Sequence, residues 1–302
     1  MGLRTPREVD VEPPLSSRER HEPIDAREAR LRLPTGAVRM TVPTPRGPMA
    51  ATAVGMDAAD EWFCFVPGYL SSKEDFYAVM SLLAEQGRGA VAFDLRGQRE
   101  SGSAQAAQDC SLEAMAADAC AVAEQVRSRW SLGPGHLVGH SLGGLIAQQA
   151  AAQCAWASIT LLCSGPAALP AHRAGVFPLI RRFLPLVDRD ALWERKLGLE
   201  RAAGAPEAAP AVAEFERARW RGYDSIALDE GARILLETSP IEPPAPCPPV
   251  RVVWGANDDG WPIGQQRELA VRWNGRMVEL PGLGHQPQLE GASALVDALL
   301  GG

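Results

Sequence analysis

A serine between two glycines is the residue around which chemistry could be organised in this sequence. Gly139-His-Ser-Leu-Gly143 follows a short apolar run and precedes a helix-forming segment at 145–152. Gly139 and Gly143 have no Cβ, so main chain can pass close to both sides of Ser141. A sharp strand-to-helix turn of this kind exposes a serine hydroxyl at a helix N-terminus, where free N–H groups favour the negative charge of an acyl-transfer intermediate. The pattern predicts that Ser141 is a nucleophile.

A serine hydroxyl needs a base to take its proton. His285 is the favoured base, because it follows the last expected strand in a loop that can fold over the end of the sheet. Ligands and chemistry collect at that end in open α/β sheets. The other four histidines fit the role less well: His21 lies in a charged arm, His136 begins a strand, His140 points away from where Ser141 points, and His172 lies in a Pro-rich stretch.

The base in turn needs a carboxylate to orient it. Asp258, which follows an apolar run ending at Trp254, is favoured over its neighbour Asp259. Asp94 is the other contender, but the stretch 94–97 is more typical of a loop ordered by local hydrogen bonds. The chain order serine, aspartate, histidine is that of hydrolases with a nucleophile elbow.

The negative charge of the transition state requires hydrogen-bond donors. The main-chain N–H of Leu142, directly after the serine, is one candidate, and the loop after Val66 offers another through Tyr69 or Leu70. Pro67 cannot donate. We expect Leu142 and Tyr69 to form an oxyanion hole.

The elements that must hold these groups alternate between apolar runs of strand length and segments of helix length. This alternation predicts an α/β fold with right-handed crossovers and a mainly parallel sheet. The first two runs are joined by a Pro- and Gly-containing turn at 43–47, so the sheet should begin antiparallel. Ser72 and Asp75 fit a capping box at the start of a helix. The eight expected strands span residues 37–42, 48–54, 62–66, 90–93, 136–138, 158–162, 250–254 and 277–280.

The chain divides into three parts by composition. Residues 1–34 form a charged, Pro-containing arm without apolar periodicity, which either moves freely or drapes over the domain through charge pairs. Residues 35–165 and 249–302 carry the strands and form the core domain. Residues 166–248 contain only short helical patterns separated by Pro and Gly, which predicts a helical cap.

The motifs, taken together, are similar to those of α/β-hydrolase fold enzymes with a cap, from about residue 37 to residue 300. The resemblance implies a flanked eight-stranded sheet and a serine–aspartate–histidine triad. Two departures concern the loops near the serine: Pro67 stands where the family often has His, and Gln98-Arg99-Glu100 is bulkier than the usual small turn, which could reshape the pocket mouth. The residues that carry the resemblance are Pro67-Gly68-Tyr69, Asp94-Leu-Arg-Gly97, Gly139-His-Ser-Leu-Gly-Gly144, Gly255-Ala-Asn-Asp258 with Pro262, and Gly284-His285.

Apolar side chains near the serine would form the substrate pocket. Most aromatic residues of the cap should pack against the core domain, and the remainder should face the cleft. Arg181 and Arg182 could bind a substrate carboxylate, but a solvated helix face is the favoured interpretation. The residues expected to bind substrate are Tyr69, Leu70, His140, Trp261, Phe177 and Trp193.

Composition limits the partners. The chain of 302 residues has a net charge of −7 and no cluster of basic residues, which argues against nucleic acid. No apolar run is long enough for a membrane span, and no secretory signal is visible. The six cysteines include no Cys-x-x-Cys pair and no His at metal spacing, so we expect reduced thiols, a cytoplasmic location, no metal and no cofactor. The oligomeric state stays open.

The leading hypothesis is a serine hydrolase that cleaves an ester, thioester or lactone of a small to medium apolar acid. The same residues could serve a C–C bond hydrolase, an acyl transferase or a cyclase. A non-catalytic binding protein on this scaffold is the alternative from another class, although a binding protein has no need of all three triad residues. Relatives that act on epoxides or haloalkanes use aspartate at the elbow, so Ser141 argues against both activities.

Overall fold

An eight-stranded sheet forms the centre of the computed structural model, which describes residues 26–175, 177–184, 186–202, 204 and 207–301. The strand order is β1-β2-β4-β3-β5-β6-β7-β8. Residues 1–25, most of the predicted arm, lie outside the described residues. The strands are β1 Val38–Val42, β2 Met49–Val54, β3 Trp62–Val66, β4 Gly89–Phe93, β5 His136–His140, β6 Ser158–Leu162, β7 Val250–Gly255 and β8 Arg276–Leu280.

The sheet is parallel except at its N-terminal edge. Strand β2 runs antiparallel to both β1 and β4, and every other neighbouring pair is parallel. Strands β3, β4 and β6 are buried along their whole length, as continuous apolar runs in a sheet covered on both faces should be. The predicted α/β fold, with a mainly parallel sheet and an antiparallel edge, is confirmed.

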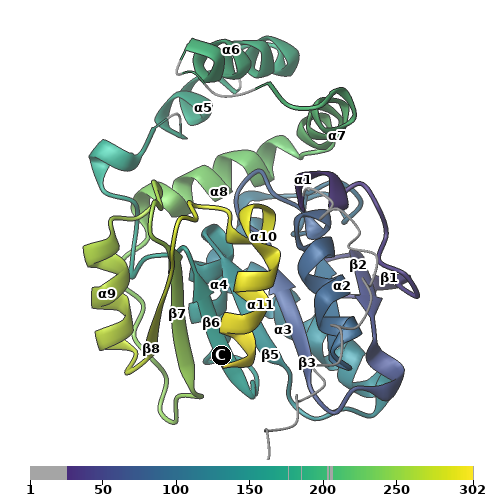
Figure 1. The fold of residues 1–302 in the computed structure, drawn as a ribbon. Helices are drawn as coiled ribbons and strands as arrows, with labels where there is room; N and C mark the ends of the chain where they lie inside the picture. Colours follow the sequence, from purple (N-terminus) through teal and green to yellow (C-terminus); the bar gives the residue numbers. More distant parts are fainter. Residues whose placement is uncertain (1–25, 176, 185, 203, 205–206, 302) are drawn as a thin grey trace, which may run out of the picture.

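Helices cover both faces of the sheet (Figure 1). Helices α2 and α11 pack against each other on one face, and α3 and α4 pack together on the other. Helix α9 packs on β7 near the opposite edge from β1. These helices and the short ones around them are α1 Ala26–Ala29, η1 Met56–Ala58, η2 Lys73–Phe76, α2 Tyr77–Glu85, η3 Ala107–Cys110, α3 Leu112–Trp130, α4 Leu142–Ala150, α9 Ile263–Arg272, α10 Pro287–Glu290 and α11 Ala292–Leu300.

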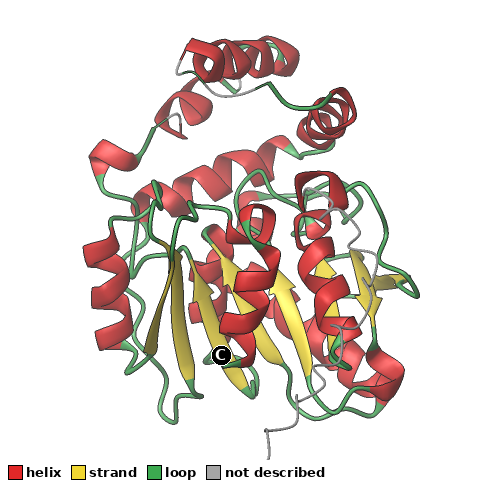
Figure 2. Ribbon diagram, in the orientation of Figure 1, coloured by secondary structure: helices red, strands yellow, loops and turns green. Residues whose placement is uncertain are grey.

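Four helices between β6 and β7 form a roof over the carboxyl ends of the strands, and we call them the cap helices. Figure 2 shows α8 lying across the strand ends, with α5, α6 and α7 standing farther from the sheet. A small apolar cluster of Trp193, Trp220, Tyr223 and Leu228 joins α6, α7 and α8, and α5 packs against α8. The cap helices are α5 Phe177–Phe183, α6 Arg189–Ala202, α7 Pro210–Arg221 and α8 Ser225–Glu237, preceded by η4 Ala171–Arg173.

The capping box predicted at Ser72 and Asp75 is wrong. Ser72 does precede the helical turn η2, but its side chain makes no capping hydrogen bond, and its buried hydroxyl has no partner among the described residues. Asp75 is buried below cap helix α7, and its carboxylate accepts hydrogen bonds from Arg30 and Arg219. Two guanidinium groups outcompete a main-chain N–H for one carboxylate because charge-assisted hydrogen bonds are the stronger ones.

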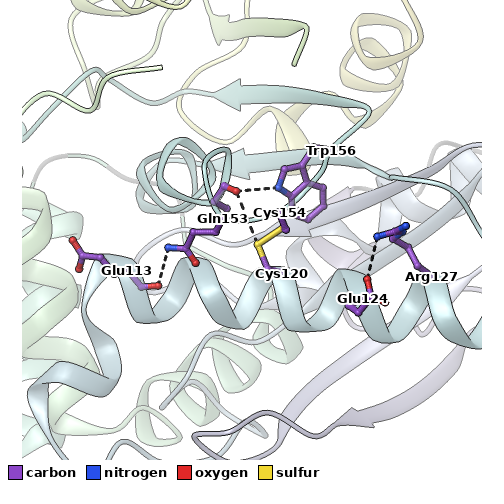
Figure 3. Close-up of a disulfide and its surroundings, with 8 residues drawn as sticks. Glu113, Cys120, Glu124, Arg127, Gln153, Cys154 and Trp156 are labelled. Atoms are coloured by element: carbon purple, nitrogen blue, oxygen red, sulfur yellow. Dashed lines mark hydrogen bonds and ion pairs between the residues drawn. A yellow bond between two sulfur atoms is a disulfide. The ribbon is translucent and has the colours of Figure 1, made fainter. Parts of the chain in front are cut away.

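The expectation that all cysteines are reduced is also wrong. Cys120 of α3 forms a disulfide with Cys154, which follows α4, at a Cα–Cα distance of 6.0 Å (Figure 3). The two cysteines are 34 residues apart, a spacing that does not indicate a pair. Helices α3 and α4 bring them together by packing side by side. The other four cysteines are free: Cys64, Cys110 and Cys163 are buried, and Cys247 is exposed.

Candidate active site

The turn between β5 and α4 places Ser141 in a strained conformation. Its φ is 55° and its ψ −117°, a region that residues with a Cβ rarely adopt. A Cβ on Gly139 would lie 2.1 Å from the Gly143 carbonyl oxygen, and one on Gly143 would lie 2.2 Å from that of Val66, so both positions need glycine. Ser164 Oγ donates to the Ser141 carbonyl at 2.9 Å and helps to hold the turn. The serine is thereby fixed at the carboxyl end of the sheet.

The structure brings Ser141, His285 and Asp258 together from the ends of three parallel strands. The distance from His285 Nε2 to Ser141 Oγ is 3.1 Å, and the distance from His285 Nδ1 to Asp258 Oδ1 is 2.6 Å. Ser141 follows β5, Asp258 follows β7, and His285 follows β8. With Nδ1 donating to the carboxylate, Nε2 is left as the acceptor for the serine proton, which is the arrangement that general-base catalysis requires.

The carboxylate of Asp258 is held in its ionised form. Burial by itself would raise the pKa of Asp258, but hydrogen bonds from His285, from Gly260 N–H at 2.8 Å and from Gln266 Nε2 at 2.7 Å bring that pKa below its usual value. An ionised carboxylate keeps the imidazole in one tautomer and stabilises the imidazolium that forms during proton transfer. Gln266, in α9, was not singled out from the sequence, where a glutamine within a helix carries no special signal.

The two rival aspartates are engaged elsewhere. Asp94 is buried at the end of β4, where its carboxylate pairs with Lys73 Nζ at 2.6 Å. Burial is the largest influence on Asp94 and raises its pKa to about 6. Asp259 is exposed, and its main-chain carbonyl accepts a hydrogen bond from Arg173.

The loop after β3 offers main-chain donors beside the serine. A Cβ on Gly68 would lie 3.1 Å from Ser141 Cβ, so the loop passes directly against the serine. The N–H groups of Tyr69 and Leu70 have no hydrogen-bond partner within the described ranges, and Leu70 has a left-handed φ of 57°. Leu142 is the first residue of α4, and its N–H has no partner within the helix. These are the amides from which an oxyanion hole could be built.

Three of the residues predicted to bind substrate lie where the loop meets the cap helices. The Tyr69 hydroxyl donates to the Leu228 carbonyl at 2.9 Å. The ring of Tyr69 stands edge-on to Phe177 of α5, with ring centroids 5.2 Å apart. Leu70 packs against the apolar cluster of the cap helices. All three are half-buried.

The other three have packing partners that explain their burial without a ligand. His140 is buried behind the serine, and its Nε2 lies 2.7 Å from the His285 carbonyl oxygen. Trp261 is almost fully buried against Gly165 and donates to the Ala167 carbonyl. Trp193 packs on Trp220 inside the cap cluster, with ring centroids 5.9 Å apart. Their assignment to a substrate pocket therefore has no support in these contacts.

A hollow of about 380 Å³ lies beside α8, apart from the serine. Arg181 of α5, which was expected to be solvated, forms ion pairs with Asp229 and Glu237 of α8. The lining of the hollow combines polar and apolar side chains from Ala107, Leu184, Ser225, Ile226, Asp229 and Glu230.

One group in the described part of the chain has potential metal ligands close together. Atoms of Cys163, Asp258 and His285 lie within 4.8 Å of one another. Asp258 and His285 already bond to each other, however, and burial raises the pKa of the Cys163 thiol well above its usual value. A protonated thiol is a poor ligand, so these contacts fit a packed triad better than a metal site.

In the described part of the chain, no helix combines the length and the apolar character needed to cross a bilayer.

Solved structures of several esterases are similar to this one. A carboxylesterase from the thaumarchaeon Nitrososphaera gargenis has a TM-score of 0.69 at 18% identity, over 87% of this chain and 97% of its own. The esterase EaEST from Exiguobacterium antarcticum has a TM-score of 0.70 at 16% identity, over 87% of this chain and 98% of its own. The thioesterase domain of the curacin biosynthetic pathway has a TM-score of 0.60 at 18% identity, over 87% of this chain and 99% of its own. At these identities the likeness shows the fold alone.

No curated protein matches the sequence. A model of the alpha/beta hydrolase family does match it, over residues 65–298, which include the elbow, the cap helices and the loops that carry Asp258 and His285. Together with the sheet order, this match over most of its length shows that the chain belongs to the alpha/beta hydrolase family.

Proposed function

We propose that this protein is a serine hydrolase that cleaves a carboxylic ester, thioester or lactone of a small to medium apolar acid. One observation carries the proposal. A serine held in a strained turn lies 3.1 Å from an imidazole nitrogen whose partner nitrogen lies 2.6 Å from a buried carboxylate. This arrangement lowers the barrier to proton transfer from the hydroxyl and has no evident structural purpose of its own.

In the proposed reaction, Ser141 Oγ attacks the substrate carbonyl carbon while His285 Nε2 takes the hydroxyl proton. The N–H groups of Leu142 and Tyr69 stabilise the resulting oxyanion. When the tetrahedral intermediate collapses, the bond to the leaving group breaks and His285 gives the proton to that group. Water then attacks the acyl-enzyme with the same base, which releases the acid and restores Ser141. Asp258 stays ionised throughout and orients the imidazole.

The comparisons support an acyl substrate in a general way. Three of the similar structures are a carboxylesterase, an esterase and a thioesterase domain, and esters and thioesters are acyl compounds. The apolar surroundings of Tyr69, Leu70 and Phe177 at the edge of the cap helices favour an apolar acyl group. Among the described residues, no contact favours C–C bond cleavage, acyl transfer or ring closure over hydrolysis.

We retain the division into an arm at 1–34, a core domain at 35–165 and 249–302, and a cap at 166–248, with the cap as the roof of the proposed site. The sequence predicts a cytoplasmic location on the premise that all thiols are reduced, and the disulfide removes that premise. A disulfide between Cys120 and Cys154 is typical of proteins that reside in an oxidising compartment. We therefore favour such a compartment for this protein.

A fluorophosphonate probe tests the proposed nucleophile directly. The folded wild-type protein should be labelled at Ser141, and Ser141→Ala should remain unlabelled. The same two proteins are then assayed on a series of p-nitrophenyl esters of increasing acyl length and on a panel of lactones. Hydrolysis by the wild type, reduced about 10⁴-fold in Ser141→Ala, is the expected result. Folded wild-type protein that neither reacts with the probe nor hydrolyses any substrate would instead indicate a binding protein.

A further inference from the structure

The loop that passes against Ser141 is anchored to the cap helices at two tyrosine hydroxyls. Tyr69, in the loop, donates its hydroxyl proton to the Leu228 carbonyl of α8. Tyr223, between α7 and α8, donates its hydroxyl proton to the Ser71 carbonyl of the loop. Burial raises the pKa of Tyr223 well above its usual value, so this phenol keeps its proton. The loop therefore donates one hydrogen bond to the cap and accepts another from it.

A buried carboxylate forms the third tie. Asp75 Oδ1 and Oδ2 both lie 2.8 Å from Arg219 Nη1 of α7. Asp75 Oδ2 also accepts from Ser71 Oγ at 2.6 Å, so the carboxylate joins the loop to the cap helix directly. Burial would raise the pKa of Asp75, but the charges of Arg219 and Arg30 outweigh it and lower that pKa. The pair is thus a true ion pair.

Arg30 supplies a second cation to the same carboxylate. It precedes β1, is only 3% exposed, and lies 3.3 Å from Asp75 Oδ1 and 2.6 Å from Glu216 of α7. Arg30 and Arg219 also lie over the ring of Phe215, in α7, at 5.5 and 5.4 Å from its centroid. With two guanidinium groups on Asp75, either one can be removed while the carboxylate keeps a partner.

The bulky turn that departs from the family pattern contributes to the same contact. Gln98 Nε2 donates to the Gly68 carbonyl at 3.3 Å, and its Oε1 accepts from Leu95 N–H at 2.9 Å. Arg99, with a left-handed φ of 41°, lies 4.8 Å from the centroid of the Phe215 ring. The turn therefore supports the loop on one side and the cap helix on the other, and does not merely narrow a pocket mouth.

On the basis of the proposed function, we infer that Asp75, Arg219 and Tyr223 are positioning residues for the oxyanion hole. Through them, α7 and the connection between α7 and α8 hold the loop that carries the Tyr69 N–H against Ser141. The docked cap then completes the catalytic site besides covering it. Misplacing a donor by a fraction of an ångström reduces the stabilisation of the transition state far more than the binding of the substrate. The reason is that the full negative charge exists only in the transition state.

Two variants loosen the loop without touching the triad. Tyr223→Phe removes one hydroxyl, and Arg219→Met removes one cation while Arg30 stays on Asp75. Arg221→Met is the matched control, because Arg221 is also in α7 but pairs with Asp190 of α6, away from the loop. For each protein we would measure kcat and KM on one p-nitrophenyl ester, and the inhibition constant of a trifluoromethyl ketone with the same acyl part. This ketone adds to Ser141 as a hemiketal that carries an oxyanion. Thermal melts show that each variant is folded.

The inference predicts a fall in kcat of about tenfold or more in both loop variants, with KM changed less than about threefold. The inhibition constant of the ketone should rise by the same factor as kcat/KM falls, and Arg221→Met should match the wild type. Loop variants with unchanged kcat, a loss confined to KM, an unaltered inhibition constant, or an equal loss in Arg221→Met would overturn the inference while the proposed function stands. A wild type without esterase activity would overturn both.

Discussion

The ring of His140 holds the main chain of His285. His140 Nε2 lies 2.7 Å from the His285 carbonyl oxygen, and its Nδ1 lies 3.4 Å from Gln288 Nε2. A carbonyl oxygen can only accept, so Nε2 carries the proton and Nδ1 accepts from the glutamine amide. Burial lowers the pKa of His140 to about 4, which keeps the ring neutral at ordinary pH. His140, in the elbow, thus orients the loop that carries His285.

Replacing His140 by leucine should slow the reaction without removing any catalytic group. His140→Leu leaves the His285 carbonyl without its buried donor, so the loop can shift and the imidazole loses its alignment with Ser141. We expect kcat to fall about tenfold, whereas His140→Gln, which keeps a donor, should lose less. Steady-state kinetics on one ester would measure both. Equal losses in the two variants would indicate that ring packing matters more than the hydrogen bond.

The same residue should make stability depend on pH. The pKa of His140 is about 4 in the folded protein and about 6.5 in an unfolded chain. Between these values the unfolded chain binds a proton that the folded protein does not, so stability falls as the pH falls. Between pH 7 and pH 5 the loss from this group is about 2 kcal/mol.

Urea unfolding at the two pH values measures this loss, with His140→Gln as the control. His285, Asp258 and the other ionisable groups remain in both proteins, so their contributions cancel in the comparison. The difference in unfolding free energy between pH 7 and pH 5 should be about 2 kcal/mol smaller in the variant. The same pH dependence in both proteins would show that His140 is not responsible.

Gln266 should matter to catalysis through Asp258. Its amide lies 2.7 Å from Asp258 Oδ2 and helps to lower the pKa of that carboxyl. In Gln266→Leu the buried carboxylate loses a charge-assisted hydrogen bond, a loss of about 1.5–3 kcal/mol. We expect kcat to fall about tenfold in Gln266→Leu, compared with about 10⁴-fold in Asp258→Asn. A pH–rate profile of each variant would measure these losses. A Gln266→Leu enzyme with wild-type kcat would limit the role of Gln266 to packing.

The sheet and the elbow could be predicted because their signals are local. Buried parallel strands are continuous apolar runs, and the turn at Ser141 needs glycines at fixed spacing. The partners of Asp75 could not be predicted: Arg219 is 144 residues away, and a capping box with Ser72 satisfied the local pattern equally well. Burial beneath α7 decides between these options, and burial depends on the whole fold. The catalytic roles of Ser141, Asp258 and His285 stay predictions, although the structure places the three in contact.

The disulfide can be tested by counting thiols. In urea without reductant, iodoacetamide should modify four cysteines of this chain, and six after reduction, as measured by intact mass. The double variant Cys120→Ala with Cys154→Ala should lose about 2–4 kcal/mol of unfolding free energy, because a link across 34 residues restricts the unfolded chain. Six modified cysteines without reductant would restore the reduced state predicted from the sequence.

Deleting parts of the N-terminal arm tests how far the core domain depends on residues before β1. A charged arm without apolar periodicity suggests that deletion of residues 1–34 leaves catalysis intact, but Arg30 contradicts a purely free arm, because its side chain is buried on Asp75 and Glu216. Deletion of 1–34 removes this cation and leaves Glu216 without its partner. We expect the unfolding free energy to fall by about 2–3 kcal/mol and kcat to fall with it. Deletion of 1–25, which keeps Arg30, is the matched control and should behave as the wild type. Urea unfolding and ester kinetics on both deletions would decide: equal behaviour of the two would show that Arg30 adds nothing to the hold of α7 on the loop.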